Sequence, residues 1–208
     1  MSENVERPER KPDRRVRRTR AALQQALLQL IREKPYASIT IEAIADAAGV
    51  ARPTVYAHYK DKEALLLDVS GTLLDELEER ADARTQERPN ERGAGLLVIF
   101  GHVEAHKELY RVLLRGEGGY TARLALVERL RSAYGAFFDD VIARRKTKPR
   151  VRLAALTTAW VGALMLHLEA VALGELEGSY EERAATLANV FVPGAEWALG
   201  LPAGTLFD

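Results

Sequence analysis

Residues 49–65 read GVARPTVYAHYKDKEAL and collect groups that suit contact with nucleic acid. Guanidinium, phenol, imidazole and ammonium groups follow one another at Arg52, Tyr56, His58, Lys60 and Lys62. An arginine fork fits the O6 and N7 atoms of guanine, and small apolar groups fit the methyl group of thymine. Phenol, imidazole and ammonium groups suit phosphate oxygens. The residue types therefore predict a surface that reads DNA.

The spacing places these groups on one side of a short helix. With 100° between successive residues, Val55 and Tyr59 share one face, which we expect to point inward. The opposite arc holds Arg52, Pro53, Tyr56, Ala57 and Lys60, and Thr54 and His58 flank it. We expect such a helix to lie in the major groove, which admits a single helix.

The elements around this helix follow the helix-turn-helix pattern. Leucine and isoleucine spacing predicts a first helix over residues 14–34. Thr40 can cap a second helix that Gly49 closes, a third covers residues 52–59, and Asp61 caps a fourth. Further helices are expected at 93–104, 106–116, 120–146, 150–174 and 180–200. Ser179 and Glu182 form a capping box for the last helix, and Pro193 should kink it or end it early.

Composition limits the possible functions. The 208 residues contain no cysteine, which excludes disulfides, cysteine zinc sites and thiol nucleophiles. The polar N-terminal residues do not resemble a secretory signal, and the apolar stretch 159–173 falls short of the roughly 20 residues of a membrane span. We therefore expect a cytoplasmic protein with no membrane contact.

Positive charge is concentrated at the start of the chain. Residues 1–60 hold 12 Lys and Arg against 7 Asp and Glu, although the whole chain has zero formal net charge. This asymmetry predicts a polyanionic partner for the first third. We expect residues 1–13 to be a disordered basic arm, and Arg17 and Arg18 to contact DNA phosphates or a minor groove. The alternative is a solvated charged segment.

One known family shares this arrangement of residues. Thr40, Ile41, Ile44, Ala45, Ala48, Gly49 and Val50, followed by Pro53, Thr54, Val55, Tyr56, His58, Tyr59, Lys62 and Leu65, resemble the DNA-binding domain of the Tet-repressor (TetR/AcrR) family. The resemblance implies an all-α fold of about nine helices, with a helix-turn-helix head over 14–62 and a ligand-binding and dimerisation domain over 63–208. It also implies base and groove contacts by Arg52, Pro53, Thr54 and Tyr56. Backbone contacts are implied for Thr40, Tyr56, His58 and Lys62. Ala51 departs from the pattern, because the family usually has a capping residue there.

The resemblance carries two expectations for the remaining helices. The last two helices would form a homodimer, which would place two reading helices on a palindrome about 34–36 Å apart. A small-molecule effector would bind among the fifth to eighth helices. The expected ligand-binding residues are Phe100, Val103, Tyr110, Leu114, Tyr134, Phe138, Trp160, Leu164 and His167. Taken alone, each of these residues is more often plain core than part of a ligand-binding wall.

Histidines raise the question of a metal. His102 and His106 stand four residues apart, a spacing that zinc could use, but Val103 replaces the glutamate of the protease motif and no third ligand is evident. We expect no metal and no cofactor, and a solvated or capping role for this pair. His167 and Glu169 interrupt an apolar helix and need partners if they are buried.

These observations favour a ligand-responsive, DNA-binding transcriptional regulator, a repressor that a small molecule releases from its operator. The alternative is a scaffold or antagonist that kept the fold without operator binding. An enzyme is not expected, since the sequence has no P-loop, no dinucleotide-binding fingerprint and no HExxH motif.

Overall fold

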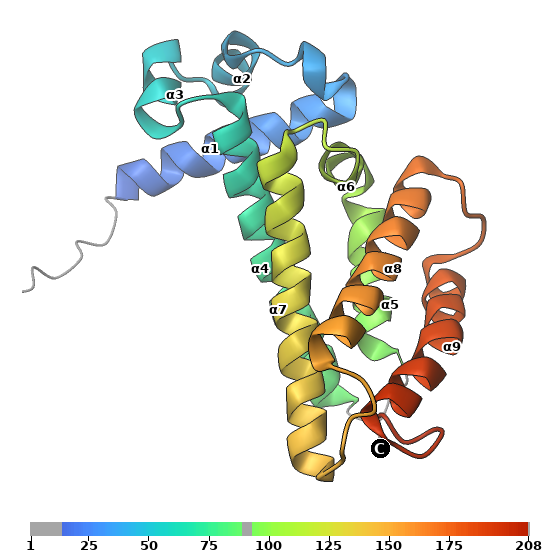
Figure 1. The fold of residues 1–208 in the computed structure, drawn as a ribbon. Coiled ribbons are helices and arrows are strands. Elements are labelled where there is room, and N and C mark those ends of the chain that lie inside the picture. The colour runs from blue at the N-terminus through green and yellow to red at the C-terminus, as the bar shows by residue number, and fades with distance from the viewer. Residues whose placement is uncertain (1–13, 89–92, 208) are drawn as a thin grey trace, which may run out of the picture. The chain divides into compact units, whose positions relative to one another are not determined.

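The computed structural model describes residues 14–88 and 93–207, and this part of the chain contains helices and turns but no strand (Figure 1). The predicted arm at 1–13 lies outside the described residues. The described helices are nine α-helices and one short 3-10 helix, so the expected all-α class is confirmed. The chain divides into two compact units, one ending at Leu65 and the other beginning at Leu66.

The first unit is a small helical head. It contains α1 (Arg14–Glu33), the 3-10 helix η1 (Tyr36–Ser38), α2 (Ile41–Ala48), α3 (Arg52–His58) and the first residues of α4 (Lys62–Glu87). Its core is formed by buried apolar and aromatic side chains from every element: Leu23, Leu27, Leu30, Ile31, Tyr36, Ile39, Ile44, Ala45, Val55, Tyr59 and Leu65. The sequence did not predict η1.

Caps fix the short helices of the head. The Thr40 hydroxyl accepts a hydrogen bond from the Ala43 amide at 3.2 Å, and Gly49 closes α2 with a left-handed φ of 66°. The Asp61 carboxylate accepts from the Ala64 amide at 2.7 Å and so caps α4. Ala51 begins α3 without a side-chain cap, and Pro53 stands in the first turn. These four expectations are confirmed.

The second unit packs the remaining helices around one core. It contains the rest of α4 together with α5 (Ala94–Ala105), α6 (Lys107–Leu114), α7 (Tyr120–Arg145), α8 (Leu153–Leu173) and α9 (Tyr180–Leu199). Helix α8 contacts α5, α6, α7 and α9, and α5 also packs on α9. Since the hydrophobic residues of α8 lie nearly all round the helix, it can contact neighbours on several sides.

Helix α9 begins with a capping box and contains a proline in its interior. Ser179 and Glu182 form the predicted capping box, with bonds of 2.8 and 3.3 Å. Of the two alternatives for Pro193, an early end of the helix is wrong, because α9 continues to Leu199, and a kink stays a prediction. The buried neighbours Val192 and Ala195 hold this segment against the core, and such packing can outweigh the helix penalty of proline.

A buried carboxylate follows on the same helix. Glu196 is 3% exposed, and its two oxygens accept the Gly204 amide at 2.9 Å and the Leu206 amide at 3.1 Å. These bonds fold the segment after α9 back onto the helix and satisfy a charge that would otherwise be costly to bury.

Among the described helices, α8 alone is long and apolar enough to cross a membrane by length and composition. The sequence expectation counted a shorter apolar stretch within this helix. Buried helices of soluble proteins meet the same criterion, and Trp160, Leu164 and Leu168 of α8 lie in the core of the second unit.

Candidate nucleic-acid interface and candidate ligand cavity

The side chains of α3 divide into two faces, as the sequence predicted. Val55 and Tyr59 are buried, and Tyr56 is 47% exposed. The exposed residues are Arg52, Pro53, Tyr56 and Ala57 on the helix and Lys60, two residues after its end, and Thr54 and His58 are half-buried at the margins of this set. The head therefore presents an outward surface of one guanidinium, one phenol and small apolar groups.

Arg52 is held by neighbours on two helices. Its Nη1 lies 2.5 Å from a carboxylate oxygen of Glu42 on α2, and its Nη2 donates to the Tyr56 hydroxyl at 3.2 Å. The guanidinium carbon also lies 5.5 Å from the centre of the Tyr56 ring. The hydrogen bond with Tyr56 and then the charge of Glu42 raise the pKa of Arg52. Glu42 was not among the predicted site residues, because only the folded head brings it beside Arg52.

Lys62 contributes to the structure of the head itself. Its ammonium donates to the carbonyl oxygens of Tyr36 at 3.0 Å and Ile39 at 3.1 Å, and lies 4.4 Å from the centre of the Tyr36 ring. An ammonium has three donors, so one remains for a phosphate oxygen. The predicted backbone contact stays a prediction, and Lys62 also fastens the start of α4 to the η1 turn.

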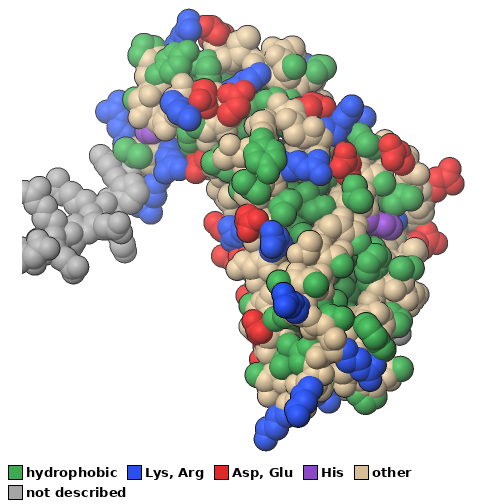
Figure 2. Space-filling view, in the orientation of Figure 1, with side chains coloured by type: hydrophobic (Ala, Val, Ile, Leu, Met, Phe, Trp, Pro, Cys, Tyr) green, Lys and Arg blue, Asp and Glu red, His purple; other side chains and the backbone are tan. Residues whose placement is uncertain are grey.

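The other predicted DNA contacts lie on exposed parts of the head. Thr40 is exposed while its oxygen caps α2. Arg17 and Arg18 are exposed on the first turns of α1, next to Arg14 and Arg15. Blue side chains gather over this end of the helix in Figure 2. These positions are compatible with the predicted contacts, which remain predictions.

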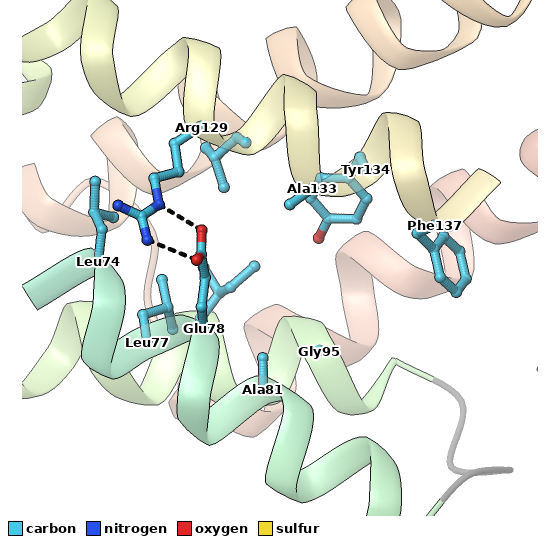
Figure 3. Close-up of a pocket in the computed structure, with 11 residues that line it drawn as sticks. Leu74, Leu77, Glu78, Ala81, Gly95, Arg129, Ala133, Tyr134 and Phe137 are labelled. Atoms are coloured by element: carbon cyan, nitrogen blue, oxygen red, sulfur yellow. Dashed lines mark hydrogen bonds and ion pairs between the residues drawn. The ribbon is translucent and has the colours of Figure 1, made fainter. Parts of the chain in front are cut away.

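A cavity lies in the second unit, and we call it the α4–α5–α7 cavity. Its volume is about 170 Å³. The described residues that line it are Leu74, Leu77, Glu78, Ala81, Gly95, Ile99, Arg129, Leu130, Ala133, Tyr134 and Phe137 (Figure 3). Most of these side chains are apolar, which suits a ligand that buries apolar surface.

An ion-pair cluster stands at one side of this cavity. Arg129 of α7 bonds both carboxylate oxygens of Glu78 on α4, at 2.5 and 2.6 Å, and its Nη2 also lies 2.5 Å from a carboxylate oxygen of Asp75. Figure 3 shows the two bonds to Glu78 bridging the helices. The hydrogen bonds with Glu78 and Asp75 raise the pKa of Arg129, which stays charged. No local pattern in the sequence indicates this pairing, because Arg129 and Glu78 lie 51 positions apart in the chain.

The predicted ligand residues only partly coincide with the cavity. Tyr134 lines it, but Phe100, Val103, Tyr110, Leu114, Phe138, Trp160, Leu164 and His167 do not. Seven of these eight are buried in the core, and His167 sits with its ring edge-on to Phe100, 5.4 Å between centres. Residue type alone could not separate core from cavity wall, since both are apolar and aromatic.

Glu169 and Arg183 have charged partners within the second unit, whereas the buried Nε2 of His167 has no hydrogen-bond partner. Glu169 lies 3.5 Å from Arg123, and Arg183 lies 3.1 Å from Glu104. Burial, with a smaller effect from Arg183, lowers the pKa of His167. The need for partners, stated from the sequence, is thus met for Glu169 by a salt bridge.

The expectation of a solvated histidine pair is wrong for His102. This residue is 2% exposed, and its Nδ1 lies 3.0 Å from the Tyr110 hydroxyl. Its ring centre is 4.6 Å from that of His106, which stands at the junction of α5 and α6. Burial, then His106 and Arg80, lowers the pKa of His102 to about 4. Among the described residues, no group of three or more His, Cys, Asp or Glu could hold a metal ion.

A short helix that follows a glycine-closed helix and presents an exposed polar face defines a helix-turn-helix protein. Residues 23–69 match the family model described as bacterial regulatory proteins of the tetR family. Over these residues the chain is similar to the TetR family.

Two curated relatives match part of the chain. EthR of Mycobacterium tuberculosis, an HTH-type transcriptional regulator, is 33% identical over an alignment of 108 positions that covers 48% of this chain and 45% of EthR. YxbF of Bacillus subtilis, an uncharacterised HTH-type regulator, is 51% identical over 59 residues, 28% of this chain and 16% of YxbF. The chain thus spans less than half the length of these relatives.

Solved structures share the fold over most of the chain. A TetR-family regulator from Syntrophomonas wolfei superposes with a TM-score of 0.72 at 16% identity, covering 86% of this chain and 95% of that one. FadR of Thermus thermophilus, a TetR-family repressor solved with lauroyl-CoA, gives a TM-score of 0.65 at 18% identity, covering 84% and 94%. At these identities the likeness is one of fold.

Proposed function

We propose that this chain is a ligand-responsive transcriptional repressor that binds a palindromic operator as a homodimer. The observation that carries the proposal is the exposed face of α3, with Arg52 and Tyr56 pointing away from the buried Val55 and Tyr59. This face offers groups that pair with base edges and phosphates, on an element of the size the major groove admits. A cytoplasmic location follows from a DNA partner.

Dimerisation is supported by a surface on the last two helices, which we call the α8–α9 apolar face. It consists of the exposed residues Ala159, Gly162, Leu166, Val190, Pro193 and Trp197. Leu166 is 67% exposed and Trp197 56%, a large apolar exposure that a partner would remove from water. Figure 2 shows hydrophobic side chains over this part of the second unit. A second copy of the chain would cover the face and supply the second reading helix.

Regulation would arise from differential binding. A ligand that prefers one arrangement of the dimer shifts the population toward it, and operator affinity changes by the ratio of the ligand's affinities for the two arrangements. The α4–α5–α7 cavity offers a place for such a ligand. Solved relatives include an operon activator as well as a repressor, so the direction of the effect is part of the proposal.

The test uses operator DNA from the intergenic region beside the gene. Arg52→Ala and Tyr56→Ala should each weaken binding about ten- to hundredfold, the effect of losing a good base contact, and leave the dimer folded. Arg131→Ala is the matched control, because Arg131 is an exposed arginine paired with Glu128 at 3.4 Å on α7. Affinity would be measured by fluorescence anisotropy and folding by circular dichroism.

Two results would overturn the proposal. Unchanged operator affinity in both variants would show that α3 does not read DNA. A parent protein that binds neither operator nor random duplex, at any salt concentration, would favour the scaffold or antagonist reading.

A further inference from the structure

The size of the α4–α5–α7 cavity limits what can enter it. Its volume of about 170 Å³ is close to that of an engineered cavity of roughly 150 Å³, lined by Leu, Ile and Phe, which binds benzene. A molecule with a single substituted ring fits such a space. A long acyl chain with a nucleotide head group exceeds this volume, so most of it would lie outside the cavity.

The described lining offers little for a charged ligand. Apart from Tyr134, its polar side chains are Glu78 and Arg129, and these already bond each other through two contacts. The remaining faces belong to aliphatic side chains, small residues and the ring of Phe137. A ligand charge placed among them would lose its water without gaining a partner.

Arg129 does not provide a binding partner for an anionic ligand. Its guanidinium faces two carboxylates, those of Glu78 and Asp75, at 2.5 Å each. A ligand carboxylate or phosphate would have to displace Glu78 and then remain beside two like charges. The charge cluster therefore selects against anions although it contains an arginine.

Tyr134 supplies one directional contact. Burial raises the pKa of its phenol to about 12, so the hydroxyl keeps its proton, and a hydrogen bond with the Trp160 side chain opposes this shift. The Trp160 indole can only donate, so the Tyr134 proton remains available for an acceptor. Figure 3 shows the Tyr134 hydroxyl directed from α7 toward the space that the lining residues surround.

We infer that the α4–α5–α7 cavity binds a neutral, mainly apolar molecule of about one substituted ring, whose single hydrogen-bond acceptor meets the Tyr134 hydroxyl. The inference deepens the proposed function, on which it rests for the idea that this molecule is the effector. The ligand class differs from the lauroyl-CoA that accompanies FadR.

The first measurement is direct binding to the full chain, without DNA. Isothermal titration would compare acetophenone, which has one ring and one acceptor, with toluene, laurate and lauroyl-CoA. We expect acetophenone to bind best, toluene to bind more weakly, and the two anions not to bind at the same concentrations.

Variants then locate the site. Gly95→Leu should abolish acetophenone binding, because Gly95 lines the cavity and an added Cβ there meets nothing within 4 Å. Gly135→Leu is the matched control, since this helical glycine also has open space but does not line the cavity. Tyr134→Phe should weaken acetophenone about five- to tenfold and leave toluene within about twofold. Circular dichroism would confirm that each variant is folded.

Each outcome separates the ligand class from the proposed function. If laurate or lauroyl-CoA binds and acetophenone does not, the inference fails, whatever happens at the operator. Failure of all four probes, or equal loss in the Gly95 and Gly135 variants, also overturns it. If acetophenone binds as expected but operator affinity is unchanged, the ligand class stands and the proposed regulation fails.

Discussion

At the scale of single residues, Glu42 and Arg52 form an ion pair on the face that we propose to meet DNA. The carboxylate of Glu42 lies on the same exposed surface as the guanidinium, 2.5 Å from it. A negative charge there repels phosphates, and it also holds the arginine fork in one orientation. The two effects oppose each other, so the carboxylate should lower affinity and sharpen selectivity.

The substitution Glu42→Gln separates these effects. Affinity for random duplex should rise by about two- to fivefold, since a charge next to phosphate is removed, and the ratio of operator to random affinity should fall. The measurement is anisotropy with both duplexes over a series of salt concentrations. Glu33→Gln, a change on α1 outside this pair, should alter neither quantity. An unchanged affinity ratio in the Glu42 variant would show that Arg52 needs no partner to select its base.

At the scale of elements, the α5–α6 junction buries a titratable group. His102 bonds Tyr110 of α6 from within α5, so the neutral imidazole is part of the packing between these helices. Protonation would place a charge in an apolar setting beside His106. The junction should therefore weaken in acid.

The sign of the effect follows from the two pKa values. With a folded pKa of about 4 and an unfolded pKa near 6.5, the unfolded chain binds the proton first. Stability is full above pH 6.5 and falls as the pH decreases toward 4, by up to about 3 kcal/mol. Urea unfolding across this range should show the loss in the parent protein. It should be smaller in His102→Gln, which does not titrate, and equal losses would rule out His102 as the cause.

The helices could be predicted from the sequence, because a capping residue or an apolar helix face is encoded by residues that are close together in the chain. Thr40, Gly49, Asp61 and Ser179 mark helix ends where the structure has them. The candidate sites were harder, since they depend on distant contacts. No pattern of neighbouring residues in the sequence predicts the ion pair between Glu42 and Arg52 or the one between Arg129 and Glu78. The exposed face of α3 could be predicted because it lies on one short helix, whereas the cavity wall comes from three helices.

At the scale of the whole molecule, the proposed assembly depends on the α8–α9 apolar face. Val190 and Leu166 stand exposed on two different helices of the second unit, where small residues such as Gly162 would let another backbone approach. A charge in this face would be buried without a partner in the dimer.

Leu166→Glu should therefore dissociate the dimer, with a loss of at least tenfold in operator affinity, because each protomer then reads one half-site alone. Light scattering coupled to size exclusion gives the mass directly. Leu124→Glu is the control: this leucine is also exposed, but on α7. A Leu166 variant that remains dimeric would place the subunit contact elsewhere.

Glu196 gives the end of α9 a second role. Its carboxylate oxygens accept hydrogen bonds from amides that lie eight and ten residues later, so the last described turns complete the hydrogen bonding of this buried side chain. Trimming those turns would strip an interior anion of both donors. Protein engineers who add a purification tag or fluorescent reporter to this chain should therefore fuse it beyond Leu206 and keep the native residues before the fusion point intact.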